Sequence, residues 1–341
     1  AMKKHVAIIG GGIAGMETAM NIAKAGHRVT VLERTDRMGG HVGNWNHLFP
    51  DFSSPDEVVS ELDANLSKVD VNVVLKTEVT SITKSNGRFA IVAGRDMQIQ
   101  ADAVVVSSGF NLFDATHKEE YGYGIFDNVI TSADLEGIIK EKKKLTTSQG
   151  TPPKRIAIIH CVGSRDAKSG NTYCSKVCCI TGVKQAIEIN KLLPNCEVFC
   201  FYMDLRLYGS NFDDLYLMAQ KEHRIQFVRG RLSEAAEKPD KSLQIKAEDT
   251  LSGRPLRMNV DMIVLLVGME PGESTLSIAN NGIQTDVNGF FKSKNMHTAR
   301  NHSTVEGVFL AGACICPMSI NETLENSRSA AVEVVRYLER D

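Results

Sequence analysis

Four of the eight cysteines fall within nineteen residues, a density that points to metal chemistry. They are Cys161, Cys174, Cys178 and Cys179, and four thiolates are the ligand count of an iron–sulfur cluster or a structural zinc ion. The spacings match neither the bacterial ferredoxin run nor a zinc ribbon. Adjacent cysteines suit one zinc ion poorly because neighbouring side chains diverge, but they can reach separate irons if the second leads a helix. One or two buried thiols without a metal remain an alternative.

Glycines near the N-terminus have the spacing of a dinucleotide-binding turn. Gly10, Gly12 and Gly15 lie between an apolar strand at residues 5–9 and an amphipathic helical stretch at 16–25. Gly10 permits the tight turn, Gly12 lets the backbone approach a pyrophosphate, and Gly15 lets the helix pack closely on the strand. The free amides at the helix start then face the phosphates, so a dinucleotide site is expected.

An acidic residue and a second glycine pair extend this site. A second strand, residues 28–32, ends at Glu33, where a carboxylate can bind the ribose hydroxyls. The segment Arg37-Met38-Gly39-Gly40 follows directly, as in flavoproteins that bind two dinucleotides. FAD is therefore favoured over NAD.

The C-terminal region returns to flavin-type sequence. Residues 308–313 form an apolar strand with glycine, and Ser319 and Glu322 form a possible capping box for a helix that runs to residue 338. That helix start would direct amides and its positive dipole end at a flavin ring. The alternative is an ordinary capped surface helix.

The residues expected to bind FAD lie in these turns and at neighbouring strand ends. They are Gly10, Gly12, Ile13, Ala14, Gly15, Glu33, Arg34, Gly39, Gly40, His41, Val79, Ser108, Gly109, Gly312, Ala313, Asn321 and Thr323.

The order of these motifs predicts a discontinuous α/β fold of two domains, since 341 residues exceed one compact core. Residues 1–125 and 290–341 are predicted to form the FAD-binding domain, and residues 126–289 an inserted Rossmann-like domain. The inserted domain is degenerate, because its first strand and turn contain one glycine, Gly163, where a phosphate cradle needs three. A conventional NAD(P)H site there is therefore doubtful.

Other candidate groups are Lys184 and the remaining cysteines. Lys184 follows Cys179 by five residues on a predicted helix at 180–192, so it could approach a flavin, although a surface lysine is the alternative. Cys196 and Cys200 face one side of a strand and suit a core. Cys314 and Cys316 are a candidate dithiol beside the flavin, or packing residues.

Composition narrows the function classes. The 39 basic and 41 acidic side chains nearly cancel, which favours neither a nucleic acid nor an anionic membrane as partner. We expect neither a transmembrane segment nor an export leader, and therefore a cytoplasmic location. Because thiols stay reduced in that compartment, we do not expect a disulfide framework.

Taken together, these motifs strongly resemble the HdrA family of heterodisulfide reductase subunits, and the resemblance covers nearly the whole chain. The motifs that carry it are the N-terminal glycines with Glu33, the spacing Cys161-x12-Cys174-x3-Cys178-Cys179, Lys184 and residues 307–312. The resemblance implies a thioredoxin-reductase-like, two-dinucleotide-binding fold, FAD, and a [4Fe–4S] cluster bound by the four cysteines. It also implies that Lys184 lies near the flavin.

Departures from the family pattern indicate which branch the chain resembles. Methanogen members are much longer and have cysteines soon after the second glycine pair, whereas residues 49–55 here have none. The sequence is more similar to the short bacterial sulfur-oxidising form, or to its relative in quinone-interacting complexes of sulfate reducers. Ala313 replaces an aspartate that contacts the ribityl chain in many flavoproteins of this fold.

The resulting hypothesis is an electron-transfer subunit that oxidises sulfane sulfur on a carrier of the lipoate type. Its expected partners are a second copy of itself and other iron–sulfur subunits. The rivals are a free-standing NAD(P)H-dependent disulfide reductase, which needs a second nucleotide cradle and a dithiol, and a non-catalytic scaffold that binds FAD and metal.

Overall fold

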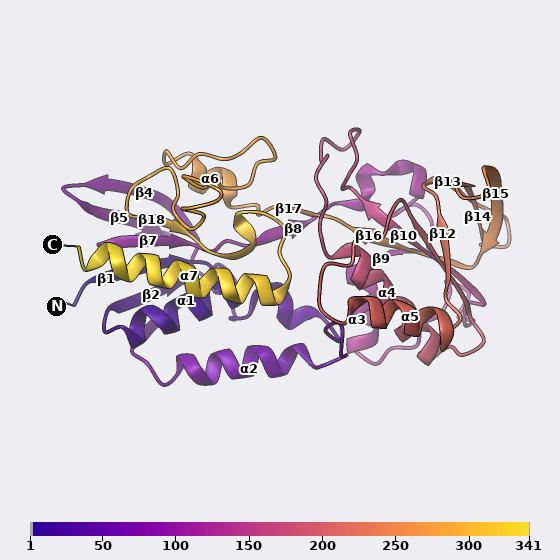
Figure 1. The fold of residues 1–341 in the computed structure, drawn as a ribbon, viewed down its shortest axis with the longest axis horizontal. Coiled ribbons are helices and arrows are strands. Elements are labelled where there is room, and N and C mark those ends of the chain that lie inside the picture. Colours follow the sequence, from indigo (N-terminus) through magenta and orange to yellow (C-terminus); the bar gives the residue numbers. More distant parts are fainter. Residues whose placement is uncertain (1–2, 341) are drawn as a thin grey trace. The chain divides into compact units, whose positions relative to one another are not determined.

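The computed structural model describes residues 3–340, and the chain divides into two compact units (Figure 1). Unit 1 comprises Ala1–Gly43, Pro55–Asn111 and Glu270–Asp341, and unit 2 comprises Asn44–Ser54 and Leu112–Met269. Residues 1, 2 and 341, at the ends of the predicted FAD-binding domain, lie outside the described part.

The unit boundaries differ from the predicted ones. Residues 112–125 group with unit 2, where Phe113 and Tyr121 lie in the hydrophobic core. Residues 270–289 group with unit 1, where Ile278 and Ile283 pack in the core. Composition could not indicate this, because the apolar residues at both crossings suit either core equally well.

Unit 1 is built on a five-stranded parallel sheet of order β18-β7-β1-β2-β3. The strands are β1 (His5–Ile9), β2 (Arg28–Leu32), β3 (Val71–Val74), β7 (Ala103–Val106) and β18 (Val308–Leu310). Every residue of β1 and β7 is buried. Such continuous apolar runs are typical of parallel strands whose two faces are both covered.

Helices cover one face of this sheet and strands cover the other. The helices α1 (Ile13–Lys24) and α7 (Ile320–Leu338) share a core with one set of strand residues, and α2 (Pro55–Leu66) packs against α1. The opposite face packs against an antiparallel sheet of β4 (Val79–Ser85), β5 (Arg88–Ala93) and β6 (Met97–Ala101), with α6 (Thr275–Ala279).

Unit 2 repeats this plan with the parallel order β12-β11-β10-β16-β9. Its strands are β9 (Val129–Thr131), β10 (Arg155–Val162), β11 (Glu197–Tyr202), β12 (Gln226–Arg229) and β16 (Met262–Val267). The central strand is β1 in unit 1 and β10 in unit 2, each with parallel strands on both sides, which is the Rossmann arrangement predicted for each half.

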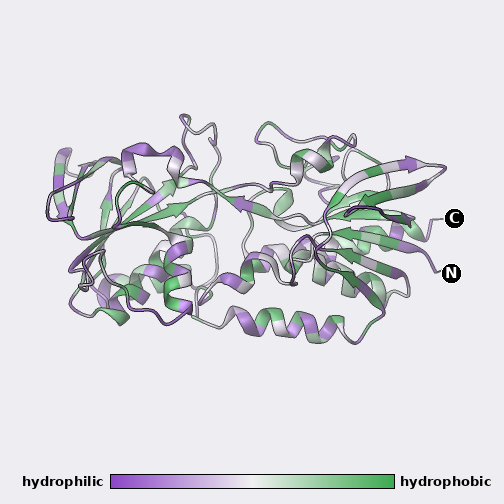
Figure 2. Ribbon diagram, turned by 180° about the vertical axis from the view of Figure 1, so that it is seen from behind, coloured by the Kyte–Doolittle hydropathy of each residue, from purple (hydrophilic) through white to green (hydrophobic). Residues whose placement is uncertain are grey.

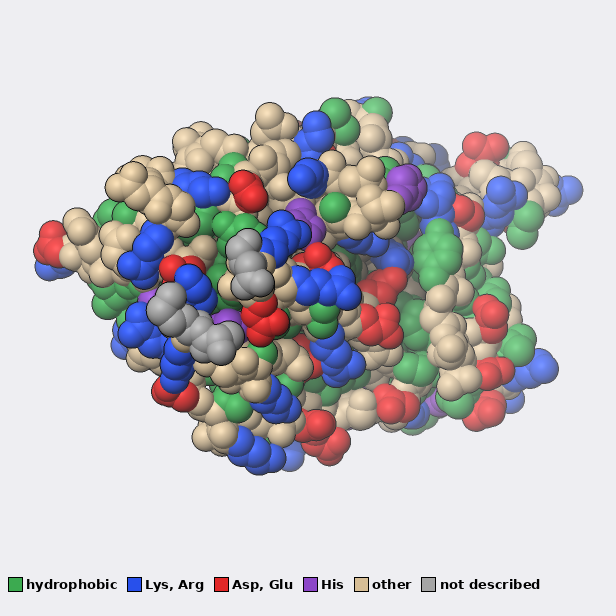
Figure 3. All heavy atoms as spheres, turned by 60° about the vertical axis from the view of Figure 1, so that its left-hand side comes forward, with side chains coloured by type: hydrophobic (Ala, Val, Ile, Leu, Met, Phe, Trp, Pro, Cys, Tyr) green, Lys and Arg blue, Asp and Glu red, His purple; other side chains and the backbone are tan. Residues whose placement is uncertain are grey.

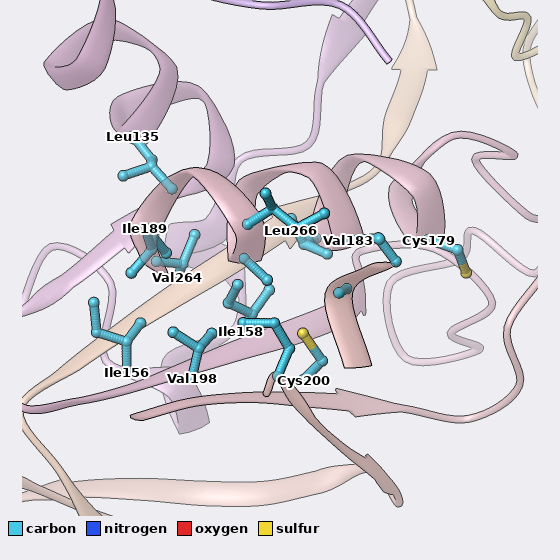
Figure 4. Close-up of a cluster of buried hydrophobic side chains, with 14 of the residues drawn as sticks. Leu135, Ile156, Ile158, Cys179, Val183, Ile189, Val198, Cys200, Val264 and Leu266 are labelled. Carbon is cyan, nitrogen blue, oxygen red and sulfur yellow. The ribbon is translucent and has the colours of Figure 1, made fainter. Parts of the chain in front are cut away.

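As in unit 1, helices cover one face of the parallel sheet of unit 2 and an antiparallel sheet covers the other. One face packs against α3 (Ser132–Lys140), α4 (Cys178–Leu192) and α5 (Phe212–Lys221), and Figure 4 shows aliphatic side chains of α4 lying over those of the strands. The other packs against an antiparallel sheet of β13 (Leu232–Glu237), β14 (Leu243–Asp249) and β15 (Arg254–Val260). The hydrophobic colouring of the central strands in Figure 2 agrees with this double burial.

Short elements complete the described chain. They are β8 (Phe110–Leu112), paired with β17 (Met269–Pro271), and four 3₁₀ turns at Gly40–Asn44, Ala115–His117, Glu119–Tyr121 and Gly312–Cys314.

None of the helices within residues 3–340 combines the length and the apolar character needed to cross a membrane. On the face drawn in Figure 3, Lys and Arg side chains lie among Asp and Glu side chains. That face therefore carries both signs of charge, in keeping with the formal net charge of −2.

Candidate functional site

The glycine turn after β1 forms a narrow cradle in unit 1. Gly10 has φ +108°, and a Cβ on it would lie 2.4 Å from the carbonyl oxygen of Ser107. A Cβ on Gly15 would lie 1.9 Å from the carbonyl oxygen of Gly10, whereas a Cβ on Gly12 would approach nothing closer than Gly40 Cα at 3.9 Å. Packing thus requires Gly10 and Gly15, while Gly12 leaves open space in front of α1, where a pyrophosphate fits.

Glu33 lies directly after β2 and holds the glycine turn against this strand. Its Oε2 accepts a hydrogen bond from Gly11 N at 2.6 Å, and its Oε1 accepts from Thr35 N and Thr35 Oγ1, both at 2.8 Å. A carboxylate has about four acceptor positions, so capacity remains for a ribose hydroxyl. Glu33 therefore supports the turn as well as fitting its predicted ligand role.

The second glycine pair lies against the first turn. Gly39 N donates to Gly11 O at 2.9 Å, and Gly39 and Gly40 adopt φ of +103° and +59°. His41 follows, with its ring stacked on Phe110 at 4.5 Å and its Nε2 2.8 Å from the Phe110 carbonyl oxygen. The segment after β2 is thereby held beside the proposed phosphate position.

The C-terminal segment meets the start of α1 at Gly312. A Cβ on Gly312 would lie 2.7 Å from Ala14 Cβ and 3.2 Å from Thr323 Cγ2, which places the first turns of α1 and α7 on either side of this glycine. The predicted capping box of α7 is confirmed, because Ser319 and Glu322 exchange side-chain and backbone hydrogen bonds. The start of α7 therefore has a fixed direction.

The remaining predicted FAD residues have varied surroundings. Ser108 Oγ, after β7, is buried without a hydrogen-bond partner among the described residues, so it has bonding capacity for a ligand. Arg34 forms an exposed ion pair with Glu273 at 3.0 Å, and Asn321 is exposed on the first turn of α7. Val79 and Ala313 are buried. Ile13 opens α1, and Gly109 follows Ser108 with φ +67°.

Three of the four predicted metal ligands come together in unit 2. Cys161 Sγ lies 3.9 Å from Cys178 Sγ, and Cys178 and Cys179 are the first two residues of α4. All three side chains are buried. Cys174 lies half-buried on the connection between β10 and α4, where its sulfur accepts a hydrogen bond from Lys176 N at 3.3 Å.

A histidine that the sequence analysis did not select joins this group. The ligand atoms of His160, Cys178 and Cys179 all lie within 4.8 Å of one another. Figure 4 shows Cys179 at the start of α4. His160 directly precedes Cys161, and that adjacency was the one available signal.

The three buried thiols shift one another's pKa. Hydrogen bonds with Cys161 and Cys179, together with burial, raise the pKa of Cys178 well above its usual value. The hydrogen bond with Cys178 lowers the pKa of Cys161 and of Cys179, in both cases against the effect of burial. Three thiolates this close repel one another, so all of them ionise together only when a cation binds.

Positive side chains lie beside the thiols. Arg165 and Arg206 both pair with Asp204, and the charge of Arg165 adds to the lowering of the Cys161 pKa that the Cys178 hydrogen bond begins. The Cys179 thiol also donates to the Asp204 carbonyl oxygen at 3.8 Å. The charge of Arg165 therefore favours the anionic form of Cys161.

Lys184 is buried on α4, so the surface-lysine interpretation is wrong. It is 2% exposed, and its Nζ lies 2.5 Å from Glu136 Oε1, 3.3 Å from Glu188 Oε2 and 2.9 Å from the His47 carbonyl oxygen. Its expected position near a flavin stays a prediction.

The other cysteines are isolated thiols. Cys200 is fully buried in β11, and burial raises the pKa of Cys196 to about 12. The Cys314 thiol donates to two backbone carbonyl oxygens, while Cys316 accepts a hydrogen bond from Arg300 at 2.9 Å. These contacts favour the interpretation of Cys314 and Cys316 as packing residues over that of a dithiol.

Comparison with known proteins identifies the family. The model of the pyridine nucleotide-disulphide oxidoreductase family matches residues 4–332. The chain belongs to this family. As a pyridine nucleotide-disulphide oxidoreductase it is an oxidoreductase, and the family's fold indicates FAD binding, which the glycine cradle of unit 1 fits.

Among curated members, the relatives are HdrA-type subunits of heterodisulfide reductases, which confirms the resemblance. The HdrA-type subunit of the H2/formate:CoB-CoM heterodisulfide,ferredoxin reductase of Methanococcus maripaludis is 37% identical over 247 residues, covering 70% of this chain and 38% of the relative. An iron–sulfur HdrA-type subunit of the CoB–CoM heterodisulfide reductase of Methanopyrus kandleri is 38% identical over 246 residues, with the same two coverages. The chain thus spans less than half the length of these relatives.

Two solved structures of low sequence identity share the fold. The thioredoxin reductase of Lactococcus lactis has a TM-score of 0.70 at 19% identity, covering 98% of this chain and 99% of that one. The bacillithiol disulfide reductase of Staphylococcus aureus has a TM-score of 0.65 at 13% identity, covering 99% and 98%. The predicted two-dinucleotide-binding α/β fold is confirmed.

Proposed function

We propose that this chain is an electron-transfer subunit of a heterodisulfide-reductase-like complex, with FAD in unit 1 and a [4Fe–4S] cluster in unit 2. The observation that carries the proposal is the difference between two equivalent turns. In unit 1 the central strand β1 leads through glycines to α1, whereas in unit 2 the central strand β10 leads through a long connection to Cys178 and Cys179 at the start of α4.

The turn in unit 2 supports sulfur ligation better than phosphate binding. Gly163, the first glycine after β10, has φ +71°, and a Cβ there would lie 2.0 Å from the Phe113 ring. This glycine is thus needed for packing. The buried residues Cys178 and Cys179 form the start of α4, which is the position where a dinucleotide would place its pyrophosphate.

The chain's own residues would divide the work as follows. The turn around Gly12 and the start of α1 bind the pyrophosphate, and Glu33 holds that turn in place. The capped start of α7 would direct its positive dipole end at the flavin and stabilise negative charge there. Cys161, Cys174, Cys178 and Cys179 hold the cluster, with Arg165 beside Cys161. When bound, FAD supplies two-electron chemistry and the cluster one-electron chemistry.

The wider role follows from the family branch. We propose that the complex oxidises sulfane sulfur on a carrier of the lipoate type in the cytoplasm, and that the subunit forms a homodimer and contacts other iron–sulfur subunits. The name of the Methanopyrus relative, an iron–sulfur subunit of a heterodisulfide reductase, supports the cluster and the complex. The alternative complex is a quinone-interacting oxidoreductase of sulfate reduction. Lys184 is the proposed residue near the flavin.

Anaerobic purification with flavin, iron and acid-labile sulfide analysis tests the proposal. We expect one FAD and about four iron and four sulfide per chain, with an EPR signal after reduction. Cys178→Ala should lose the cluster and keep FAD. Cys200→Ala is the matched control, because Cys200 is a fully buried thiol in the same core and is no proposed ligand. Zinc, or no metal after anaerobic reconstitution, would refute the cluster and favour a thiol-based reductase.

A further inference from the structure

His160 is a buried imidazole without a conventional partner. The residue is 6% exposed, and neither Nδ1 nor Nε2 has a partner with full hydrogen-bond geometry among the described residues. After the hydrogen bond with Cys178, the His160 ring also helps to lower the pKa of Cys179, so the ring lies close to that sulfur. Burying polar atoms without hydrogen-bond partners costs free energy, so a buried imidazole of this kind indicates an interaction with a bound group. The ring is held closely, since a Cβ on Gly182 of α4 would lie 2.7 Å from His160 Cε1.

The backbone directs this ring toward the cysteines. Successive side chains of a strand normally point to opposite faces, so His160 and Cys161 should diverge. The register of β10 against β16 shifts between Ile159 and Val162, and Cys161 has φ +59°, an unusual value for a residue other than glycine. Such a bulge redirects side chains. Both residues consequently face the start of α4, where Cys161 meets Cys178 and His160 lies within 4.8 Å of Cys178 and Cys179.

We propose that His160 donates a ring N–H hydrogen bond to the sulfur of the iron–sulfur cluster and thereby raises the reduction potential of that cluster. The inference rests on the proposed function, because it requires the cluster. The proposed function assigns the four ligand positions to Cys161, Cys174, Cys178 and Cys179, which leaves His160 as a donor and not a ligand. Reduction adds one negative charge to the cluster, and a hydrogen bond to sulfur stabilises the reduced form more than the oxidised form.

Redox titration of the cluster by EPR in three proteins tests this assignment. His160→Leu removes the donor at similar volume, and His160→Gln keeps an N–H donor. At the potential where half of the wild-type cluster is reduced, we expect the reduced-to-oxidised ratio of His160→Leu to fall about tenfold, a downward shift of about 59 mV for one electron. His160→Gln should remain closer to the wild type. Iron and sulfide content is measured on each sample.

Pulsed EPR of the wild type with isotopically labelled histidine needs no variant and covers the case in which His160→Leu fails to fold. A weak nitrogen coupling to the reduced cluster supports a hydrogen bond, whereas a strong coupling, typical of an imidazole bound to iron, would overturn it. An unchanged potential in His160→Leu with full iron content would also overturn it. A wild type without iron refutes the proposed cluster itself, and the hydrogen bond with it, so the two failures are distinguishable.

Discussion

Gly15 is the residue at which the nucleotide turn leaves least room. Because a Cβ there would lie 1.9 Å from the Gly10 carbonyl oxygen, Gly15→Ala must push α1 away from the turn. We expect this change to lower the free energy of unfolding by about 1–3 kcal/mol and to reduce the FAD bound per chain. Chemical denaturation and flavin absorbance measure the two effects.

A matched glycine controls for the added methyl group. A Cβ on Gly137, inside α3, would have no atom within 4 Å, so Gly137→Ala should stabilise the protein by about 0.5–1 kcal/mol and leave FAD binding unchanged. Equal FAD contents in the two variants would contradict the proposed cradle.

Asp166 gives unit 2 a predictable sensitivity to acid. Burial acts to raise its pKa, but hydrogen bonds from Lys118 and Ser169 and the charge of Arg231 outweigh burial and hold the pKa well below the usual value. A carboxyl group with a lowered folded-state pKa adds stability above its unfolded-state pKa, near 4, and that stability is lost as the pH falls.

Asp166→Asn should remove this part of the pH dependence. We expect the variant to be less stable than the wild type at about pH 7, because Lys118 loses one of its two carboxylate partners. The difference between the proteins should shrink toward about pH 3. Urea unfolding at several pH values measures it, and a constant difference across the range would show that Asp166 is not the titrating group.

How far the sequence could specify the site depended on the kind of residue. Gly10 and Gly15 were predictable because a local turn demands their geometry. Lys184 was ambiguous, since its burial depends on Glu136 and Glu188, of which the first lies on a different helix. His160 was missed because a strand pattern places it opposite Cys161, and only the bulge in β10 brings both to one side.

At the scale of elements, two capping boxes offer a comparison between helices. Ser319 caps α7 in unit 1 and Thr131 caps α3 in unit 2, each with reciprocal hydrogen bonds to the acidic residue three positions later. Ser319→Ala and Thr131→Ala should each cost about 1 kcal/mol of stability. If the start of α7 acts on the flavin, only Ser319→Ala should also change the flavin reduction potential.

Potentiometric titration of the flavin in both variants is the measurement. A shift in neither variant would leave Ser319 a purely structural cap, as the alternative interpretation of α7 holds. An equal shift in both would instead indicate a general effect of lower stability.

The predicted bounds of helices and strands were wrong where local backbone geometry and side-chain contacts determine where an element begins or ends. The alternating pattern at residues 71–82 predicts a strand, whereas the structure has two, β3 and β4, separated at Lys76, which adopts φ +53°. The composition of residues 136–154 predicts a helix followed by an exposed connection, whereas α3 begins earlier, at Ser132, because Thr131 and Asp134 form a capping box. The strands β1 and β2, which flank the glycine turn and its helix, were predicted with their observed bounds.

At the scale of the whole molecule, one architecture occurs twice with different chemistry at the same turn. Both units place a parallel sheet between helices and an antiparallel sheet. The sequence predicted a Rossmann-like domain in each half, but it did not predict the antiparallel sheets. The points at which the chain passes from one unit to the other were not predictable, because they depend on which hydrophobic core buries residues 112–125 and 270–289.

The loss of the second cradle predicts how electrons enter the protein. Because buried cysteines lie at the start of α4 and Gly163 packs against Phe113, we expect this turn in unit 2 not to bind a nucleotide pyrophosphate. We expect NADH and NADPH to reduce the bound flavin far more slowly than dithionite does, as followed anaerobically by the bleaching of flavin absorbance. Dithionite is the control for a competent flavin. Rapid, saturable bleaching by either nucleotide would show that this oxidoreductase takes hydride directly, so that electrons need not arrive through a partner subunit.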